Sequence, residues 1–412
     1  MQQVYSPNLP NDETGSTFES AINASFGRVR ARLHECLASA GINPSESQGL
    51  TRRLGLSRSV GWRFSRVVTV DDPYQAMQHL PSGEGLQILA ASLRRVSVPG
   101  TLVESLVSAY ADFETVVQAH IGDRSALELF LDSLAGAGSV DRLEASRKTL
   151  FRGGSAVWGM QAKARIALHI LAPSRNNPSK VDIGLVGGFI GFRRLRPGVA
   201  WPFAQRTIVD AAGASIAPTE GVERIGGAVE GDELGLIRGF CTPTMPRIQS
   251  RATRAGLVYV FDDGPVGNAG LFDVFSGSVV RAVADRWRTP RESHADISTP
   301  CTAPVESLQF DVLLHKSLNF GTTPEVVQIA HAADGQAEWN GYRLPLEDRM
   351  TILRGYPLSL ATALMPRYEE LVFEVLAQVG GSVREYDAFR LVQRYPPMNT
   401  SVIARFPLPY PS

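Results

Sequence analysis

Hydrophobic residues recur at every third or fourth position through the first 136 residues, which is the spacing of amphipathic helices. The first such stripe runs from Phe18 to Leu37 and is followed by Gly41, a residue type that commonly ends helices. Further helices are predicted over 72–79, 84–95, 101–120 and 123–134. We therefore expect a flexible tail at residues 1–15 and an all-helical domain at residues 16–140.

The segment 101–120 carries its apolar residues in alternating steps of four and three, which is also the pattern of a coiled-coil seam. The pattern covers fewer than three heptads, so an ordinary core helix is the favoured interpretation. A homodimer that pairs through this helix is the alternative interpretation.

The periodicity changes after Gly153. Between residues 165 and 170, isoleucine and leucine alternate with Arg165, Ala167 and His169, which is typical of a strand. Residues 181–192 are apolar and rich in glycine, which indicates a buried strand pair. Further extended segments are predicted at 257–261 and 271–280, on either side of a turn at 262–265, and at 305–314 and 326–330.

A helical pattern returns near the end of the chain, from Pro366 to Val379, and stops at Gly380-Gly381. This segment predicts a long C-terminal helix. Residues 150–412 are therefore expected to form one α+β domain that is mainly β. The predicted fold class of the whole chain is α+β, with an all-helical N-terminal domain that contains a helix-turn-helix-like element and a mainly β C-terminal domain.

Residues 47–68 predict two short helices joined by a tight turn. Leu50 and Leu54 lie one helical turn apart, and Gly55 can adopt the left-handed conformation that ends a helix. Ser57 can cap the next helix. On that helix the apolar side chains share one face and the polar ones share the opposite face: the first set is Val60, Phe64 and Val67, and the second is Arg58, Ser59, Trp62, Ser65 and Arg66, with Arg63 on its flank.

This arrangement resembles the helix-turn-helix of bacterial transcriptional regulators, whose second helix lies in the major groove of DNA. The resemblance covers about 22 of the 412 residues and implies a DNA-binding surface. The residues expected on that surface are Arg52, Arg53, Ser57, Arg58, Ser59, Trp62, Arg63 and Arg66. The chain departs from the pattern at two positions, because Thr51 stands where a small residue is usual and Gly61 where an aliphatic residue is usual.

The charge of the chain is balanced, with 41 basic and 41 acidic residues, but its distribution is uneven. Between Ser47 and Val70 there are five arginines and no acid. Such a local excess suits a polyanion, and arginine can also hydrogen-bond a guanine edge. Residues 145–209 hold eleven basic residues and one acid, Asp182, which indicates either a second anion-binding surface or a face neutralised by the acidic segment from Asp210.

Two other stretches resemble parts of bacterial proteins of unassigned function that join a regulator-like helical domain to a second domain. They are Asp72-Pro73 with His79-Leu80-Pro81, and the segment from Gly191 to Pro197. This likeness implies no particular chemistry.

Several classes of protein lack their usual sequence signals here. No run of about 18 apolar residues predicts a membrane span, and the N-terminus has no basic segment followed by an apolar core. Cys36, Cys241 and Cys301 are widely spaced, which favours a reducing cytoplasm over a disulfide framework. The usual zinc, P-loop and serine-hydrolase motifs do not occur, and we expect neither a cofactor nor a metal.

The C-terminal domain still contains residue types that can perform chemistry. The candidate metal ligands are His294, Asp296, Cys301, His315 and His331, although their spacing is not diagnostic. A Cys301–His315 nucleophile pair is a further candidate. An active site would need a deep pocket that brings together two or more of Asp262, Asp263, His294, Asp296, His315 and His331.

The leading hypothesis is a cytoplasmic bacterial DNA-binding protein. It would be a transcriptional regulator whose C-terminal domain binds an effector or mediates oligomerisation, with double-stranded DNA as its partner and no membrane contact. One alternative is a protein–protein interaction or scaffold protein that does not bind nucleic acid, and another is an enzyme with its site in the C-terminal domain. Acidic residues that cover the arginines at 52–66 would favour the scaffold.

Overall fold

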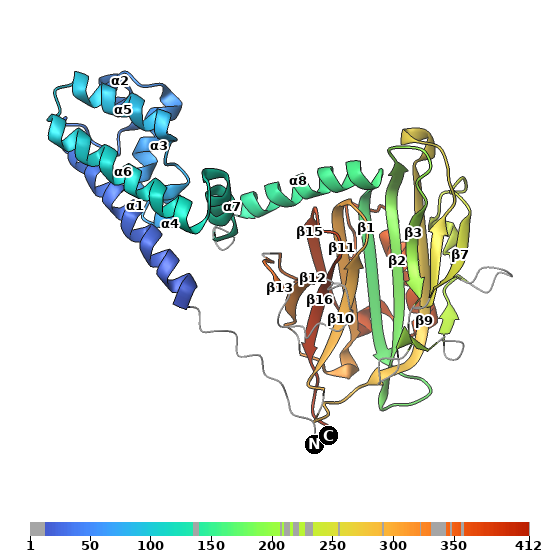
Figure 1. The fold of residues 1–412 in the computed structure, drawn as a ribbon. Coiled ribbons are helices and arrows are strands. Elements are labelled where there is room, and N and C mark those ends of the chain that lie inside the picture. Colours follow the sequence, from blue (N-terminus) through green and yellow to red (C-terminus); the bar gives the residue numbers. More distant parts are fainter. Residues whose placement is uncertain are drawn as a thin grey trace. The chain divides into compact units, whose positions relative to one another are not determined.

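The computed structural model describes residues 13–134, 140–206, 208–209, 215–216, 222–226, 234–253, 256–290, 292–321, 323–330, 343–346, 348–355 and 358–411 (Figure 1). The chain divides into two compact units, residues 1–143 and 144–412. Most of the expected tail, residues 1–12, lies outside the described residues, and the first helix already begins at Glu13. None of the helices in the described ranges is long and apolar enough to cross a membrane.

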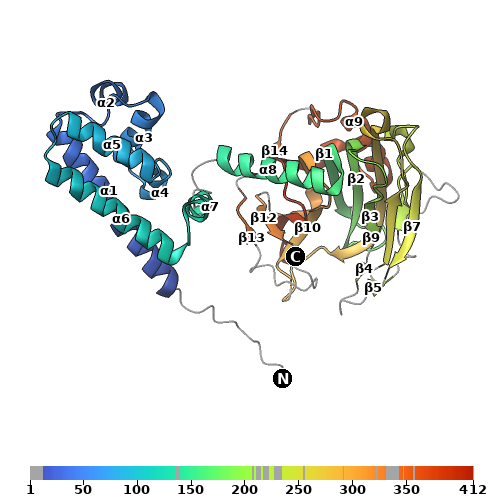
Figure 2. The same cartoon turned by 45° about the horizontal axis from the view of Figure 1, so that its top comes forward.

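The first unit is helical, as its periodicity predicts. Its helices are α1 (Glu13–Ser39), α2 (Ser47–Leu54), α3 (Arg58–Thr69), α4 (Pro73–Met77), α5 (Gly83–Arg95), α6 (Gly100–His120) and α7 (Arg124–Leu134). Asp72 and Asp123 cap α4 and α7, since their side chains accept hydrogen bonds from the backbone N–H groups of Tyr74 and Ala126. The long helices α1 and α6 lie side by side (Figures 1 and 2).

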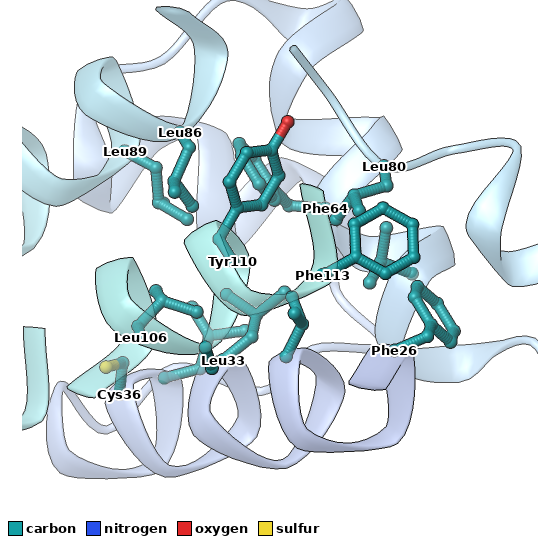
Figure 3. Packing of buried hydrophobic residues seen from close by; sticks show 14 of the residues in the cluster. Phe26, Leu33, Cys36, Phe64, Leu80, Leu86, Leu89, Leu106, Tyr110 and Phe113 are labelled. Atoms are coloured by element: carbon teal, nitrogen blue, oxygen red, sulfur yellow. The ribbon is translucent and has the colours of Figure 1, made fainter. Parts of the chain in front are cut away.

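One continuous core joins these helices (Figure 3). Phe26 and Leu33 of α1 meet Leu106 and Phe113 of α6, and Phe64 of α3 is buried in the same cluster. The apolar stripe of α6 is therefore buried against the other helices of the unit, which favours an ordinary core helix over the alternative interpretation as a dimer seam.

The second unit is built on a seven-stranded sheet. In spatial order its strands are β14 (Thr351–Leu353), β15 (Tyr386–Arg394), β11 (Val305–His315), β1 (Met160–Pro173), β2 (Lys180–Arg194), β9 (Phe272–Asp285) and β6 (Val222–Arg224). Only the β1–β11 pair is parallel among these neighbours. Helix α8 (Val140–Trp158) leads into β1 and packs Phe151 against Tyr395 at the end of β15.

Different layers cover the two faces of this sheet. Helix α9 (Tyr368–Val379) packs on the face formed by Ile166, Leu168 and Ile170 of β1. Two smaller sheets share the opposite face. The four-stranded sheet has the order β10 (His294–Cys301), β16 (Thr400–Pro407), β12 (Glu325–Ala330) and β13 (Arg343–Leu344). The three-stranded sheet has the order β3 (Trp201–Arg206), β8 (Gly256–Phe261) and β7 (Ile248–Thr253). Strands β4 (Ile208–Val209) and β5 (Ser215–Ile216) form a separate pair.

Two expectations for this unit need correction, those for residues 181–192 and for the C-terminal helix. Residues 181–192 form a single strand, β2, because its glycines admit neighbouring side chains instead of turning the chain; a methyl group on Gly184 would lie 3.1 Å from Val375 of α9. Strands β8 and β9 form where extended segments are predicted, on either side of residues 262–265, and they belong to different sheets. The predicted long C-terminal helix is α9, which has only 12 residues and is followed by β15 and β16.

Candidate nucleic-acid interface

Helices α2 and α3 are joined by the tight turn that the sequence predicts. Gly55 is left-handed, with φ 62° and ψ 34°, and its N–H donates to the carbonyl oxygen of Thr51 at the end of α2. Ser57 is extended, and its hydroxyl accepts a hydrogen bond from the Val60 N–H at 3.4 Å. A left-handed glycine followed by a capping serine therefore sets the direction in which α3 leaves the turn.

The two departures from the helix-turn-helix pattern compensate each other. A methyl group on Gly61 would lie 3.2 Å from Cβ of Thr51 and would collide with the Thr51 hydroxyl oxygen. That hydroxyl donates to the carbonyl oxygen of Ser47 at 2.8 Å, so it is held in place. The larger residue thus stands on α2 and the smaller one on α3, where the usual pattern has the reverse, and the close approach of the helices is kept.

The apolar face of α3 is anchored in the core of the unit. Phe64 and Val67 are buried with Leu50 and Leu54 of α2. Ser65, which the sequence placed on the exposed face, is also buried and donates to the Pro44 carbonyl oxygen at 2.6 Å. The helical period carries Ser65 to the edge of the buried face, where this backbone acceptor lies within reach.

The five arginines of this segment are all exposed: Arg52, Arg53, Arg58, Arg63 and Arg66. Within the described parts of the chain, none of them forms an ion pair with a carboxylate. Arg53 donates to the Gly41 carbonyl oxygen at 3.0 Å, which satisfies a hydrogen bond but leaves its charge uncompensated. The surface of α2 and α3 therefore carries a positive charge that acidic residues do not cover.

Trp62 lies among these arginines and is 49% exposed. Its ring meets the edge of His79 at a centroid distance of 5.0 Å, so one side of the indole is supported and the rest is accessible. A hollow of about 380 Å³ adjoins it, lined by Ser47, Gln48, Thr51, Arg58, Ser59 and Trp62. Ser57 and Ser59 are exposed at the start of α3.

The candidate metal ligands of the second unit are not brought together. No group of three or more His, Cys, Asp or Glu residues suited to a metal exists within the described ranges, and His331 lies outside them. Asp296 is paired with Arg405 at 2.8 Å, and His315 contacts the Ser317 hydroxyl. Cys301 and His315 have different neighbours, since Cys301 pairs with Thr400 in the sheet register and His315 with Tyr386.

These side chains also do not line the hollow that lies beside the three-stranded sheet in the described part of the second unit. A hollow of about 970 Å³ beside the three-stranded sheet is lined by residues of the segments 234–250 and by Tyr259. Asp262, Asp263, His294 and His315 are not among its lining residues.

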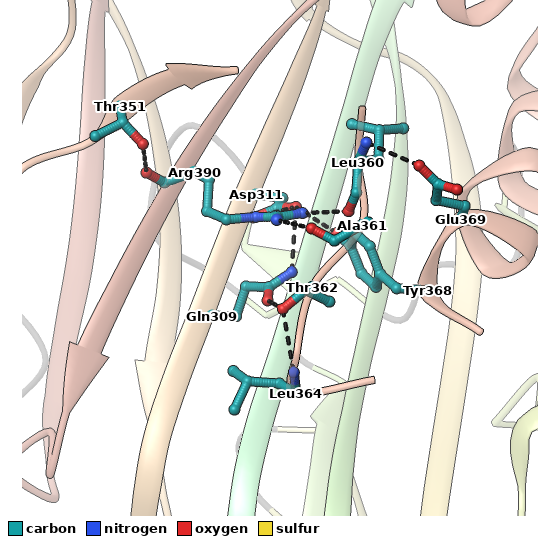
Figure 4. Close-up of polar contacts among 10 residues, drawn as sticks. All are labelled: Gln309, Asp311, Thr351, Leu360, Ala361, Thr362, Leu364, Tyr368, Glu369 and Arg390. Atoms are coloured by element: carbon teal, nitrogen blue, oxygen red, sulfur yellow. Dashed lines mark hydrogen bonds and ion pairs between the residues drawn. The ribbon is translucent and has the colours of Figure 1, made fainter. Parts of the chain in front are cut away.

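A buried polar cluster under α9 was missed by the sequence analysis (Figure 4). Arg390 of β15 is paired with Asp311 of β11, with Nη2 and Oδ2 2.7 Å apart, and Tyr368 of α9 donates to the same carboxylate at 2.7 Å. The available signal was an acid, Asp311, placed between Phe310 and the apolar residues from Val312 to Leu314. Every charge in this cluster has a partner, so the arrangement ties α9 to the sheet.

Comparisons with known proteins add no family to this picture. No family model matches the chain, and a search of curated proteins finds no significant relative.

Proposed function

We propose that the chain binds double-stranded DNA through α2 and α3 and acts as a transcriptional regulator. The observation that carries this proposal is the set of exposed arginines along the α2–turn–α3 element, which have no acidic partner among the described residues. Arginines that are exposed on a helix and lack acidic partners can attract phosphates and hydrogen-bond guanine edges.

The positions of the side chains suggest a division of roles. Arg58, Ser59, Trp62, Arg63 and Arg66 lie along the exposed side of α3, where a recognition helix meets the major groove. Arg52 and Arg53 in the last turn of α2, with Ser57 in the turn, would contact phosphates, which fix the register without reading sequence.

This role sets an expectation for the rest of the chain. The second unit would bind an effector or mediate oligomerisation, and the protein would work in the cytoplasm, where Cys36, Cys241 and Cys301 stay as the free thiols of this structure.

The test is a binding titration of the full chain with a labelled duplex of mixed sequence, between about 50 and 200 mM salt. We expect affinity to fall steeply with salt. The double variant Arg58→Ala/Arg63→Ala should bind more weakly, and the slope against log salt should fall by about one unit for each phosphate contact that is lost.

Arg32→Ala is the matched control. It removes an exposed arginine from α1 that is already paired with Glu35 at 2.7 Å. The net charge falls by one unit, as in each of the single variants Arg58→Ala and Arg63→Ala, but the proposed surface stays intact. If the full chain binds no duplex at low salt, or if the double variant binds like Arg32→Ala, the DNA-binding proposal is wrong. A partner protein captured by Trp62 and the arginines would then be the remaining hypothesis.

A further inference from the structure

Arg165 of β1 lies on the face of the seven-stranded sheet that the two smaller sheets cover. Its Nε atom is buried without a hydrogen-bond partner, and its guanidinium forms no ion pair with any described carboxylate. Burial accordingly lowers the pKa of this side chain. A buried N–H group without a hydrogen-bond partner is costly, and native structures rarely leave one so.

Other arginines inside the same unit have carboxylate or carbonyl partners, while Nε of Arg147 and Nη1 of Arg194 are also buried without a hydrogen bond. Arg147 is paired with Asp348 at 2.7 Å, and Arg281 is paired with Asp182 at 3.0 Å. Arg194 donates to the carbonyl oxygens of Val199 and Asp262. Carboxylates therefore neutralise Arg147 and Arg281, whereas no described carboxylate neutralises Arg165.

The surroundings of Arg165 provide space for its guanidinium. A methyl group on Gly187 of β2 would lie only 3.2 Å from Nη2 of Arg165, so the glycine leaves room for the guanidinium beside the strand. The Phe189 ring lies 5.1 Å from the guanidinium carbon and supports it from β2. These contacts fix the position of the charge without neutralising it.

Polar groups continue from Arg165 across the same face. His169 follows on β1, is 9% exposed, and its Nδ1 atom also has no partner. In the strand register Leu185 lies opposite His169, and Ser276 and Ser278 of β9 lie opposite Gly187 and Leu185. Residues directly opposite in a sheet share a face, so the two hydroxyls and the imidazole border one patch with Arg165.

This patch lies at the seam between the two covering sheets. The core under the four-stranded sheet includes Ala167 and Leu171 of β1, whereas the core under the three-stranded sheet includes Phe189 and Val274. Between these two cores, partial exposure remains at Arg165, Leu185, Gly187, Ser276 and Ser278, although all of them belong to interior strands. Figures 1 and 2 show β1 and β2 between the strands of the two smaller sheets.

We infer that this seam is a binding site for a small organic carboxylate, held by Arg165 and bordered by His169, Ser276 and Ser278. The guanidinium can donate two parallel hydrogen bonds to a carboxylate, which is the geometry that favours arginine over lysine in such sites. The serine hydroxyls can supply further donors, and Leu185 offers an apolar contact for the body of the ligand.

A single negative charge fits the site better than a double one. Burial lowers the pKa of His169 to about 4, so the imidazole is neutral near pH 7 and Arg165 is the one cation of the patch. A monoanion cancels that charge, whereas a dianionic phosphate would leave one charge uncompensated. The inference is independent of DNA binding, because it concerns the second unit alone.

The experiment titrates the full chain with acetate, hexanoate and benzoate. Hexanamide and benzamide are the neutral matches, and inorganic phosphate is the contrasting anion. We expect at least one carboxylate to bind in calorimetry and to raise Tm in a concentration-dependent way, while the amides do neither. Arg165→Met should weaken that binding by about tenfold or more, because it removes the charge-assisted hydrogen bonds.

Lys163→Met is the control, since it removes an exposed cation from the same strand and should leave affinity unchanged. If Arg165→Met does not fold, Gly187→Ala replaces it: the new methyl group displaces the guanidinium and should lower affinity while Arg165 is kept. The inference is overturned if none of the three carboxylates binds, if the amides bind equally well, if phosphate alone binds, or if the variants bind as the parent does.

Discussion

Arg390 and Arg165 lie on opposite faces of the same sheet and show two ways of burying one kind of side chain. Arg390 donates to both carboxylate oxygens of Asp311, and also to the carbonyl oxygens of Leu360 and Ala361 at 2.8 Å each (Figure 4). Arg165 stacks on the Phe189 ring, fills the space beside Gly187 with its guanidinium, and forms no ion pair with a described carboxylate. The first arrangement is complete within the chain, whereas the second becomes complete only when an anion is added.

This difference distinguishes a charged side chain that holds the fold together, Arg390, from one that we propose binds a ligand, Arg165. A buried ion pair adds little net stability, but the loss of one partner is expensive because the other charge stays buried alone. Asp311 and Arg390 are therefore expected to be needed for folding. Arg165 is expected to cost stability in the free protein and to be retained because of what it binds.

The largest effect should come from breaking the complete cluster. Asp311→Ala leaves the guanidinium of Arg390 buried without its carboxylate and removes the acceptor of the Tyr368 hydroxyl. We expect the free energy of unfolding of this unit to fall by about 3–5 kcal/mol in urea titrations. Asp285→Ala is the control, because its ion pair with Lys180 is partly exposed and should contribute about 0–1 kcal/mol. Similar losses in both variants would contradict the distinction.

The next largest expected effect is a loss of folding stability at acid pH, caused by His169 beside Arg165. Burial lowers the pKa of His169 from 6.5 to about 4, so below pH 6.5 the unfolded chain binds a proton that the folded chain does not. Stability should therefore fall with pH between 6.5 and about 4, by about 1.4 kcal/mol per pH unit and about 3 kcal/mol in total. His169→Gln should remove this contribution when unfolding is measured across the range. An unchanged slope in the variant would show that other groups cause it.

The third expected effect is a gain in the free energy of unfolding, whereas the first is a loss. Arg165→Met removes an uncompensated buried charge and keeps most of the apolar volume of the side chain. In the absence of ligand we expect it to stabilise the unit by about 1–2 kcal/mol, whereas Arg390→Met should destabilise it. Urea titrations of the two variants under the same conditions measure both signs. A loss of stability in Arg165→Met would mean that Arg165 has a structural role like that of Arg390.

The sequence predicted the elements whose signals are local. The 3.6-residue period located the helices of the first unit, and Gly55 and Ser57 located the turn between α2 and α3, because caps and turns depend on nearby residues. The alternation at 165–170 located β1 for the same reason. The compensation between Thr51 and Gly61 was not predictable, since it depends on how closely two helices approach.

The sequence did not predict features that depend on contacts between residues far apart in the chain. Strand β16 was not predicted, yet it pairs with β10 and β12 in the middle of a sheet. The alternation along β1 marked Arg165 and His169 as the polar side of a strand, which usually faces solvent. Only the tertiary fold places further sheets over that side, where Nε of Arg165 and Nδ1 of His169 are buried and meet no hydrogen-bond partner among the described residues.

The smallest effect on stability distinguishes the space beside Arg165 from ordinary close packing. In Gly187→Ala the backbone gain of about 0.5–1 kcal/mol from replacing a strand glycine should offset the small displacement of the flexible Arg165 guanidinium. We expect the free energy of unfolding to change by less than about 0.5 kcal/mol. Gly188→Ala is the matched control on the next residue, where the methyl group would lie 2.6 Å from the Val274 carbonyl oxygen and against the Phe275 ring. A backbone atom and a buried ring cannot move aside cheaply, so this variant should lose stability clearly in the same urea titration. Equal losses in the two variants would mean that the guanidinium is packed as tightly as the core and cannot shift to receive a ligand.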